Sequence, residues 1–301
     1  MTRPDRRRVR TLALALAGLA VVGAAVVAVA LNGRGGSGPS YVALGDSYTA
    51  GPLIPRQVAS SGLCERSTQG WAEQVARAID ASSFTNASCP GASPANVTGA
   101  QVLGAETHAP QVDSVHPSTR LVTISLGAND QHVFTGLIEG CASVAATDPQ
   151  GSPCRDHFVS GGDDTVADKL RQTRAQVVSA VQAVQAKAPD AAVVLVGYPR
   201  IVPAQGTCEA LPFAAGDYAY VDRWEHGLNA ALASAAAGTG TAYVDTYDGS
   251  AGHDACAGAA AWITGKDGTA TSASYHPNLA GMTGVAKIVD TYLQDHGLAG
   301  R

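Results

Sequence analysis

The hydrophobic and polar positions of the chain follow two periods after residue 40. Short apolar runs rich in β-branched residues occur at 120–125 (RLVTIS) and 192–197 (AVVLVG). Near-continuous apolar character over such lengths is typical of strands buried in a parallel sheet. Less apolar runs of the same kind predict further strands at 41–45, 84–88 and 241–245.

Between these runs, apolar residues recur at helical spacing. The pattern predicts helices at 71–79, 166–188 and 218–237, and a last helix for which Pro277 suits the first turn. Strands that alternate with helices favour a parallel sheet covered by helices on both faces.

The first forty residues do not share this pattern. Residues 12–31 form an uncharged apolar run of 20 residues, preceded by a basic segment with five arginines at positions 3–10. The length favours a retained transmembrane anchor, whereas Ala28-Val29-Ala30 has the form of a signal-peptide cleavage site. Both alternatives export the rest of the chain. We therefore divide the sequence into an anchor or signal peptide at 1–31, a Gly/Ser-rich linker at 32–40 and a single α/β domain at 41–301.

Charge excludes one class of partner. The chain has 20 Lys and Arg against 25 Asp and Glu, and residues 1–34 hold six of the arginines and one of the acids. The exported part is therefore acidic and has no basic stripe, so a nucleic-acid partner is not expected. We expect a monomer that touches the membrane only through an uncleaved N-terminal segment.

Six cysteines follow the export segment: Cys64, Cys89, Cys141, Cys154, Cys208 and Cys256. An even number in an oxidising compartment predicts three disulfides, for which 15 pairings exist. We favour the sequential pairing, 64–89, 141–154 and 208–256, in which each bond closes a local loop. No Cys-x-x-Cys pair occurs, so neither a zinc nor a redox centre is expected.

Four long segments lack helical or strand periodicity, and each follows a predicted strand directly or after a short element. They span 49–70, 132–164, 199–217 and 245–274. Ligands of open α/β sheets bind outside the carboxyl ends of the strands, and loops of this length in a compact domain are usually functional. We expect the site at this edge.

Four short motifs carry candidate chemistry. Ser47 in GDSY could be a nucleophile or only a helix cap. Gly91 in NASCPGAS could offer a backbone N–H or be an ordinary turn glycine. Asn129 in SLGAND could donate to an oxyanion or cap a helix. His276 in SYHPN could be a general base or a surface histidine before the last helix.

These motifs, in this order, resemble the SGNH (GDSL) family of serine hydrolases, and they span nearly the whole exported domain. The resemblance implies a three-layer α/β/α sandwich with a five-stranded parallel sheet of flavodoxin-like type. It also implies that Ser47 is the nucleophile, that His276 is the base, and that Ser47 N–H, Gly91 N–H and the Asn129 side chain are oxyanion donors. Three local disulfides fit a secreted bacterial branch of that family. No metal or cofactor is required.

The sequence departs from the family at one position. The family usually has Asp three residues before the histidine, where this chain has Ala273. Similar secreted members use a Ser–His dyad in which a backbone carbonyl orients the histidine, so we expect the carbonyl of Ala273 or Ser274 to do so. A rival is a carboxylate from elsewhere, Asp245 or Asp254.

The predicted function is an exported serine esterase or lipase that hydrolyses carboxylic esters through an acyl-enzyme. The alternatives are a polysaccharide O-deacetylase and a non-catalytic surface-binding domain on the same scaffold. Asp46 and Asp130, which stand next to the catalytic candidates Ser47 and Asn129, are expected to accept hydrogen bonds from loop N–H groups, and His253 is expected to be structural.

Overall fold

A parallel five-stranded sheet organises the part of the chain that the structure describes. The computed structural model describes residues 36–300. The predicted export segment at 1–31 and residues 32–35 of the predicted linker lie outside this range. The sheet order is β2-β1-β5-β8-β9, and all four pairings are parallel, as the sequence pattern predicts.

The strands of this sheet are β1 (Gly38–Gly45), β2 (Ala81–Asn86), β5 (Leu121–Ser125), β8 (Ala192–Val196) and β9 (Ala242–Val244). Two small antiparallel hairpins lie outside it, formed by β3 (Gln101–Leu103) with β4 (Glu106–His108), and by β6 (Val159–Ser160) with β7 (Asp163–Asp164). The helices are α2 (Ser47–Ala50), α3 (Trp71–Ala78), α4 (Val133–Val144), α5 (Pro153–Phe158), α6 (Thr165–Lys187), α7 (Tyr218–Thr239), α8 (Thr246–Gly249) and α9 (Leu279–Asp295).

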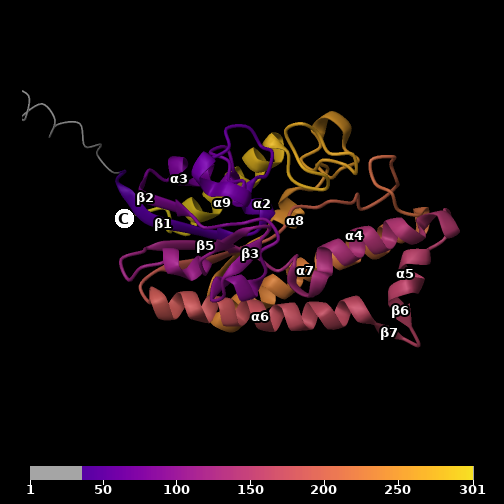
Figure 1. Ribbon diagram of the computed structural model, residues 1–301, viewed down its shortest axis with the longest axis horizontal. Coiled ribbons are helices and arrows are strands. Elements are labelled where there is room, and N and C mark those ends of the chain that lie inside the picture. The colour runs from indigo at the N-terminus through magenta and orange to yellow at the C-terminus, as the bar shows by residue number, and fades with distance from the viewer. Residues whose placement is uncertain (1–35, 301) are drawn as a thin grey trace, which may run out of the picture. The chain divides into compact units, whose positions relative to one another are not determined.

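Alternate residues of the strands point to opposite faces of the sheet and build two cores. Tyr41, Ala43 and Leu121 pack with α3 and α9 in one core. Val42 and Leu44 pack with α6 and α7 in the other. Figure 1 shows these two helix layers on either side of the sheet. The result is the three-layer α/β/α sandwich that the family resemblance implies.

The main differences from the sequence pattern are four. β1 begins at Gly38, inside the predicted linker at 32–40, because Gly38–Ser40 pair with β2 through the backbone. The strand predicted at 84–88 is Ala81–Asn86, which ends where the Asn86 side chain accepts from Ser88 N–H. Pro277 precedes α9 rather than entering its first turn, since Asn278 caps that helix by accepting from Gly281 N–H.

The fourth difference is α4, which lies in a segment, 132–164, where no periodicity is visible. Its polar face is a narrow stripe of three exposed side chains, Thr135, Glu139 and Ser143, and Gly136 and Gly140 lower its helix propensity, so its sequence signal is weak. The disulfide between Cys141 and Cys154 joins it to α5. Tertiary contacts therefore stabilise it.

Candidate active site

The Ser47 side chain lies at the carboxyl end of β1, at the start of α2. Asp46, not Ser47, caps this helix, because the Asp46 carboxylate accepts from Tyr48 N–H at 2.9 Å. The cap alternative for Ser47 is therefore wrong, and its hydroxyl is free for another partner. Gly45 makes the turn possible, since a Cβ there would lie 2.2 Å from Thr49 Oγ1.

The partner of Ser47 is His276. The two side chains are 229 residues apart in sequence, yet Ser47 Oγ lies 2.8 Å from His276 Nε2. The other ring nitrogen, Nδ1, lies 2.7 Å from the Ser274 carbonyl oxygen. A carbonyl can only accept, so Nδ1 carries the proton and Nε2 of the neutral ring is left to accept from the Ser47 hydroxyl.

Of the two carbonyls predicted to orient His276, the one that does so is that of Ser274. The Ala273 carbonyl instead accepts from the His276 backbone N–H at 3.2 Å. The rival carboxylates are engaged elsewhere: Asp245 caps α8, and Asp254 accepts from Cys256 N–H. Within residues 36–300, no carboxylate accepts a hydrogen bond from His276.

Aromatic rings enclose the imidazole. The Tyr48 ring centroid lies 5.0 Å from that of His276, and the Phe134 ring from α4 lies 6.0 Å away in an edge-on arrangement. Burial lowers the pKa of His276 below its ordinary value of 6.5, although the hydrogen bond to the Ser274 carbonyl acts in the opposite direction. The geometry therefore favours a neutral, proton-accepting His276.

Asn129 and Gly91 lie near the same strand end. The Asn129 side-chain amide donates to the Ala92 carbonyl at 3.1 Å and approaches the Asp46 carboxylate only at 3.5 Å, the limit for a hydrogen bond. Asn129 stands at the N-cap position of the short helix Asp130–His132, but its side chain makes no cap hydrogen bond, so the cap alternative is wrong. Gly91 has φ +73°, and among the described residues neither its N–H nor that of Ser47 has a backbone or side-chain acceptor.

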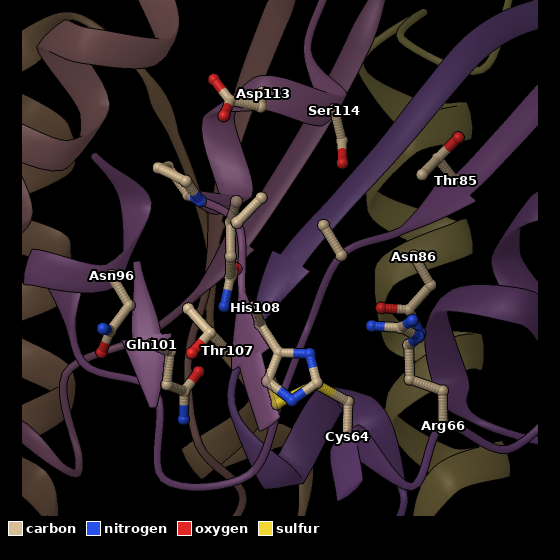
Figure 2. A pocket seen from close by; sticks show the side chains of 15 residues that line it. Cys64, Arg66, Thr85, Asn86, Asn96, Gln101, Thr107, His108, Asp113 and Ser114 are labelled. Carbon is tan, nitrogen blue, oxygen red and sulfur yellow. A yellow bond between two sulfur atoms is a disulfide. The ribbon is translucent and has the colours of Figure 1, made fainter. Parts of the chain in front are cut away.

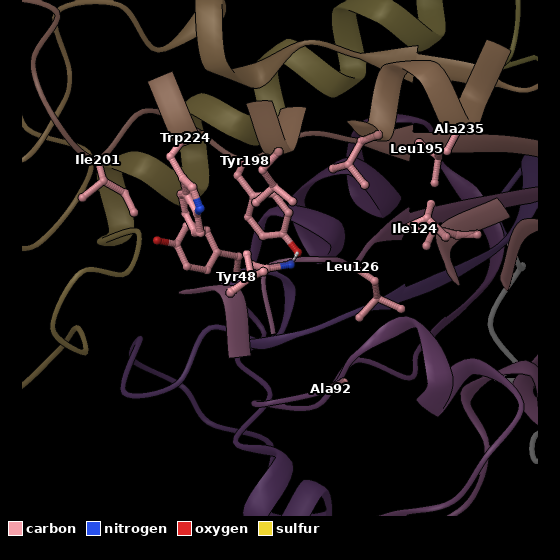
Figure 3. Close-up of a cluster of buried hydrophobic side chains, with 14 of the residues drawn as sticks. Tyr48, Ala92, Ile124, Leu126, Leu195, Tyr198, Ile201, Trp224 and Ala235 are labelled. Atoms are coloured by element: carbon pink, nitrogen blue, oxygen red, sulfur yellow. Dashed lines mark hydrogen bonds between the residues drawn. The ribbon is translucent and has the colours of Figure 1, made fainter. Parts of the chain in front are cut away.

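Two residues that the motifs do not identify hold this arrangement. Gln111 donates to the Gly45 carbonyl and accepts from Gly45 N–H, both at 2.9 Å. The Tyr198 hydroxyl donates to Asp46 at 2.6 Å, and burial raises the pKa of the Asp46 carboxyl to about 7. Figure 3 shows Tyr198 beside Tyr48 in the apolar cluster next to the site. Neither residue lies in a recognisable motif, so no local sequence signal identifies them.

The predictions for the other residues near the site, Asp46, Asp130 and His253, have different outcomes. Asp46 accepts from a backbone N–H, but it is that of Tyr48 in the first turn of α2 and not that of a loop residue. The Asp130 prediction is wrong, because this buried side chain has an oxygen, Oδ2, without any partner. His253 contacts the Ala260 carbonyl through Nδ1 and stacks on Trp262, a structural arrangement.

The three disulfides are Cys64–Cys89, Cys141–Cys154 and Cys208–Cys256, which is the sequential pairing. Cys89 precedes Gly91 by two residues, and its N–H donates to the Gly45 carbonyl. This disulfide therefore joins the loop of Gly91 to the segment that follows Ser47.

A polar cavity of about 430 Å³ lies behind this loop, lined by Cys89, Gln101, Gln111 and the His108 ring among others. Figure 2 shows the His108 ring beside the Cys64 disulfide. Their ligand-type atoms lie within 4.8 Å of one another, but both sulfurs are consumed in the disulfide and cannot also act as thiolate ligands. Neither Ser47 nor His276 lines this cavity.

Within residues 36–300, no helix has the length and apolar character needed to cross a membrane. The predicted anchor at 12–31 lies outside the described residues.

Comparisons with known proteins agree with this geometry. Residues 43–283 match the model of the GDSL-like Lipase/Acylhydrolase family. The chain is 35% identical to Lipase 2 of Streptomyces coelicolor over 287 residues, covering 93% of this chain and 95% of that protein. It resembles the crystal structure of an extracellular lipase from Streptomyces rimosus at 29% identity and a TM-score of 0.70, covering 84% of this chain and 99% of the other.

A second solved structure, phospholipase A1 from Streptomyces albidoflavus NA297, is 27% identical with a TM-score of 0.68, again covering 84% of this chain and 99% of the other. The family match spans most of the chain, and the fold and the Ser–His pair are those expected of an acylhydrolase. The chain therefore belongs to the GDSL-like lipase/acylhydrolase family and is a carboxylic ester hydrolase.

Proposed function

We propose that Ser47 is the nucleophile and His276 the general base of an exported esterase or lipase. The observation that carries the proposal is the 2.8 Å contact between Ser47 Oγ and an unprotonated Nε2 of His276. In the first half-reaction, Ser47 Oγ attacks the ester carbonyl while Nε2 takes its proton. The alcohol leaves with that proton, and a covalent acyl-enzyme remains on Ser47.

In the second half-reaction, a water molecule attacks the acyl-enzyme. His276 Nε2 removes a proton from this water, the acid is released, and the proton returns to Ser47 Oγ. The Ser274 carbonyl keeps Nδ1 protonated throughout. As a neutral group it fixes the tautomer and the ring orientation but stabilises the imidazolium less than a carboxylate does.

Each tetrahedral intermediate needs donors for its oxyanion. We assign this task to Ser47 N–H, Gly91 N–H and the Asn129 side-chain amide. The two backbone N–H groups have no acceptor within the described residues, and one Asn129 N–H is held by the Ala92 carbonyl while the other makes only a 3.5 Å approach to Asp46. Donors left without a strong partner before substrate binds are preorganised for developing charge.

The domain assignment is also proposed. Residues 41–301 form the hydrolase domain with strand β1 extending back to Gly38, 32–40 connect it to the export segment, and 1–31 direct export. The three disulfides support export, because disulfides persist in oxidising compartments. Amino-terminal sequencing of the mature protein distinguishes cleavage after Ala30 from a retained anchor.

Hydrolysis of short p-nitrophenyl esters tests the assigned roles. Ser47→Ala and His276→Ala are expected to lose about 10⁴-fold or more in kcat, and Asn129→Ala about 10²-fold to 10³-fold, each with an unchanged unfolding midpoint. His253→Ala is a matched control outside the site and is expected to retain wild-type kcat. A Ser47→Ala protein as fast as wild type would refute the assignment.

A further inference from the structure

Tyr48, the residue directly after Ser47, contacts the turn that carries His276. Its hydroxyl donates to the Tyr275 carbonyl at 2.5 Å, across 227 positions of sequence. Its backbone N–H is fixed by Asp46, and its ring packs against His276. One side chain therefore connects the nucleophile turn to the turn of the base.

The turn of His276 needs an external support. Tyr275 has φ +61°, a left-handed conformation that is strained for a bulky residue and persists only where surrounding contacts impose it. The peptide on its amino side carries the Ser274 carbonyl that orients His276, and the peptide on its carboxyl side carries the carbonyl that Tyr48 holds. A rotation at Tyr275 would therefore move the orienting carbonyl.

The other backbone hydrogen bonds of this turn join it to the loop that precedes it. Tyr275 N–H donates to the Thr264 carbonyl at 2.9 Å, and Thr264 N–H donates to the His276 carbonyl. Both hydrogen bonds go to Thr264, in the loop before the turn, and they fix the turn to its own neighbours in sequence. The Tyr48 hydroxyl is different because it fixes the turn relative to Ser47.

We propose that Tyr48 is a positioning residue for His276, holding the Ser274–His276 turn so that a neutral carbonyl can orient the imidazole where the family usually has a carboxylate. The inference rests on the proposed function, in which His276 is the base. The Ser274 carbonyl takes the geometric part of the missing acid's task, and the Tyr48 hydroxyl supports the turn that carries it, while the electrostatic part is left unfilled.

The surroundings keep the Tyr48 hydroxyl in its donor form. Burial, together with the negative charges of Glu225 and Asp46, raises the pKa of Tyr48 well above its ordinary value of 10. The Tyr198 ring packs edge-on against the Tyr48 ring, with centroids 5.3 Å apart. The donor is therefore present over the whole pH range in which His276 acts.

The variant Tyr48→Phe removes the hydroxyl and keeps the ring. Tyr218→Phe is the matched control, because Tyr218 is also buried and its hydroxyl also donates to a loop carbonyl, that of Cys208 at 2.9 Å, away from the site. We expect both variants to lower the unfolding midpoint by a similar amount. Only Tyr48→Phe is expected to lower kcat, by about 10-fold, with KM unchanged within twofold.

A spectroscopic readout separates positioning from stability. The Nδ1 proton of His276, hydrogen-bonded to the Ser274 carbonyl, is expected to give a downfield proton resonance in wild type and in Tyr218→Phe. In Tyr48→Phe it is expected to broaden through faster exchange with water. Retention of wild-type kcat and of this resonance in folded Tyr48→Phe overturns the proposal, as does an equal loss of kcat in Tyr218→Phe.

The same assays run on Ser47→Ala identify which idea fails. If Ser47→Ala is inactive and Tyr48→Phe is fully active, the positioning role alone is wrong. If Ser47→Ala is as active as wild type, the proposed function fails, and the positioning role fails with it because His276 is then not the base.

Discussion

At the scale of single residues, the site differs from a full catalytic triad in the group behind the histidine. His276 has a carbonyl at 2.7 Å on one nitrogen and the Ser47 hydroxyl at 2.8 Å on the other, with Tyr48 and Phe134 against its ring. Burial disfavours the charged imidazolium, and no carboxylate of the described residues offsets this. A base of low pKa stays neutral, and therefore active, down to a lower pH.

This predicts the acid limb of the pH profile. Because the pKa of His276 is lowered from 6.5 by burial, kcat/KM for a neutral ester is expected to rise with pH through a midpoint below 6.5 and then to level off. The measurement is kcat/KM from about pH 4 to 8. A midpoint at or above 7 would contradict the environment described for His276.

The motifs predict Ser47, Gly91, Asn129 and His276 because each stands at a strand end or a helix entry, where short-range sequence signals are strong. The choice of the Ser274 carbonyl over that of Ala273 depends on one turn's geometry, which sequence does not encode visibly. The sequence does not predict Gln111, since a single glutamine has no sequence signature and its two hydrogen bonds to Gly45 exist only after folding.

At the scale of elements, the site is built where β1 and β5 end and where α9 begins. β1 delivers Ser47, β5 delivers Asn129, and the segment before α9 delivers His276. Apolar runs predict these elements well because burial on both faces leaves a continuous signal. The predicted position of the edge strand β2 is shifted because its half-exposed, polar sequence gives a weak strand signal. The sequence pattern does not show α4 because that helix depends on tertiary packing.

The disulfide Cys64–Cys89 is expected to matter for activity as well as stability. Cys64→Ser/Cys89→Ser removes a bond across 25 residues and Cys141→Ser/Cys154→Ser one across 13 residues. Each is expected to cost ~3 kcal/mol of unfolding free energy on the loop-entropy model. Only the first is expected to lower kcat, because it frees the loop of Gly91.

Denaturant unfolding measures the stability of the two double variants, and ester hydrolysis at denaturant concentrations below the unfolding transition measures their kcat. Equal kcat in the two double variants would show that the Gly91 loop does not need its disulfide.

At the scale of the whole molecule, the described chain is one sandwich with two cores, and its active edge is assembled from segments far apart in sequence (Figure 1). The alternation of strands and helices predicts this architecture, because a parallel sheet needs crossover helices on its faces. The two solved structures reported above share the architecture over most of their length. The fold does not by itself identify the catalytic residue, so the account depends on which side chain becomes acylated.

The most direct measurement of that claim is mass spectrometry after reaction with a fluorophosphonate, which phosphonylates an activated serine. The account predicts one adduct per wild-type chain, mapped to the peptide containing Ser47, with no labelling of Ser47→Ala and much slower labelling of His276→Ala. An adduct on another residue, or equal labelling of Ser47→Ala, would contradict it.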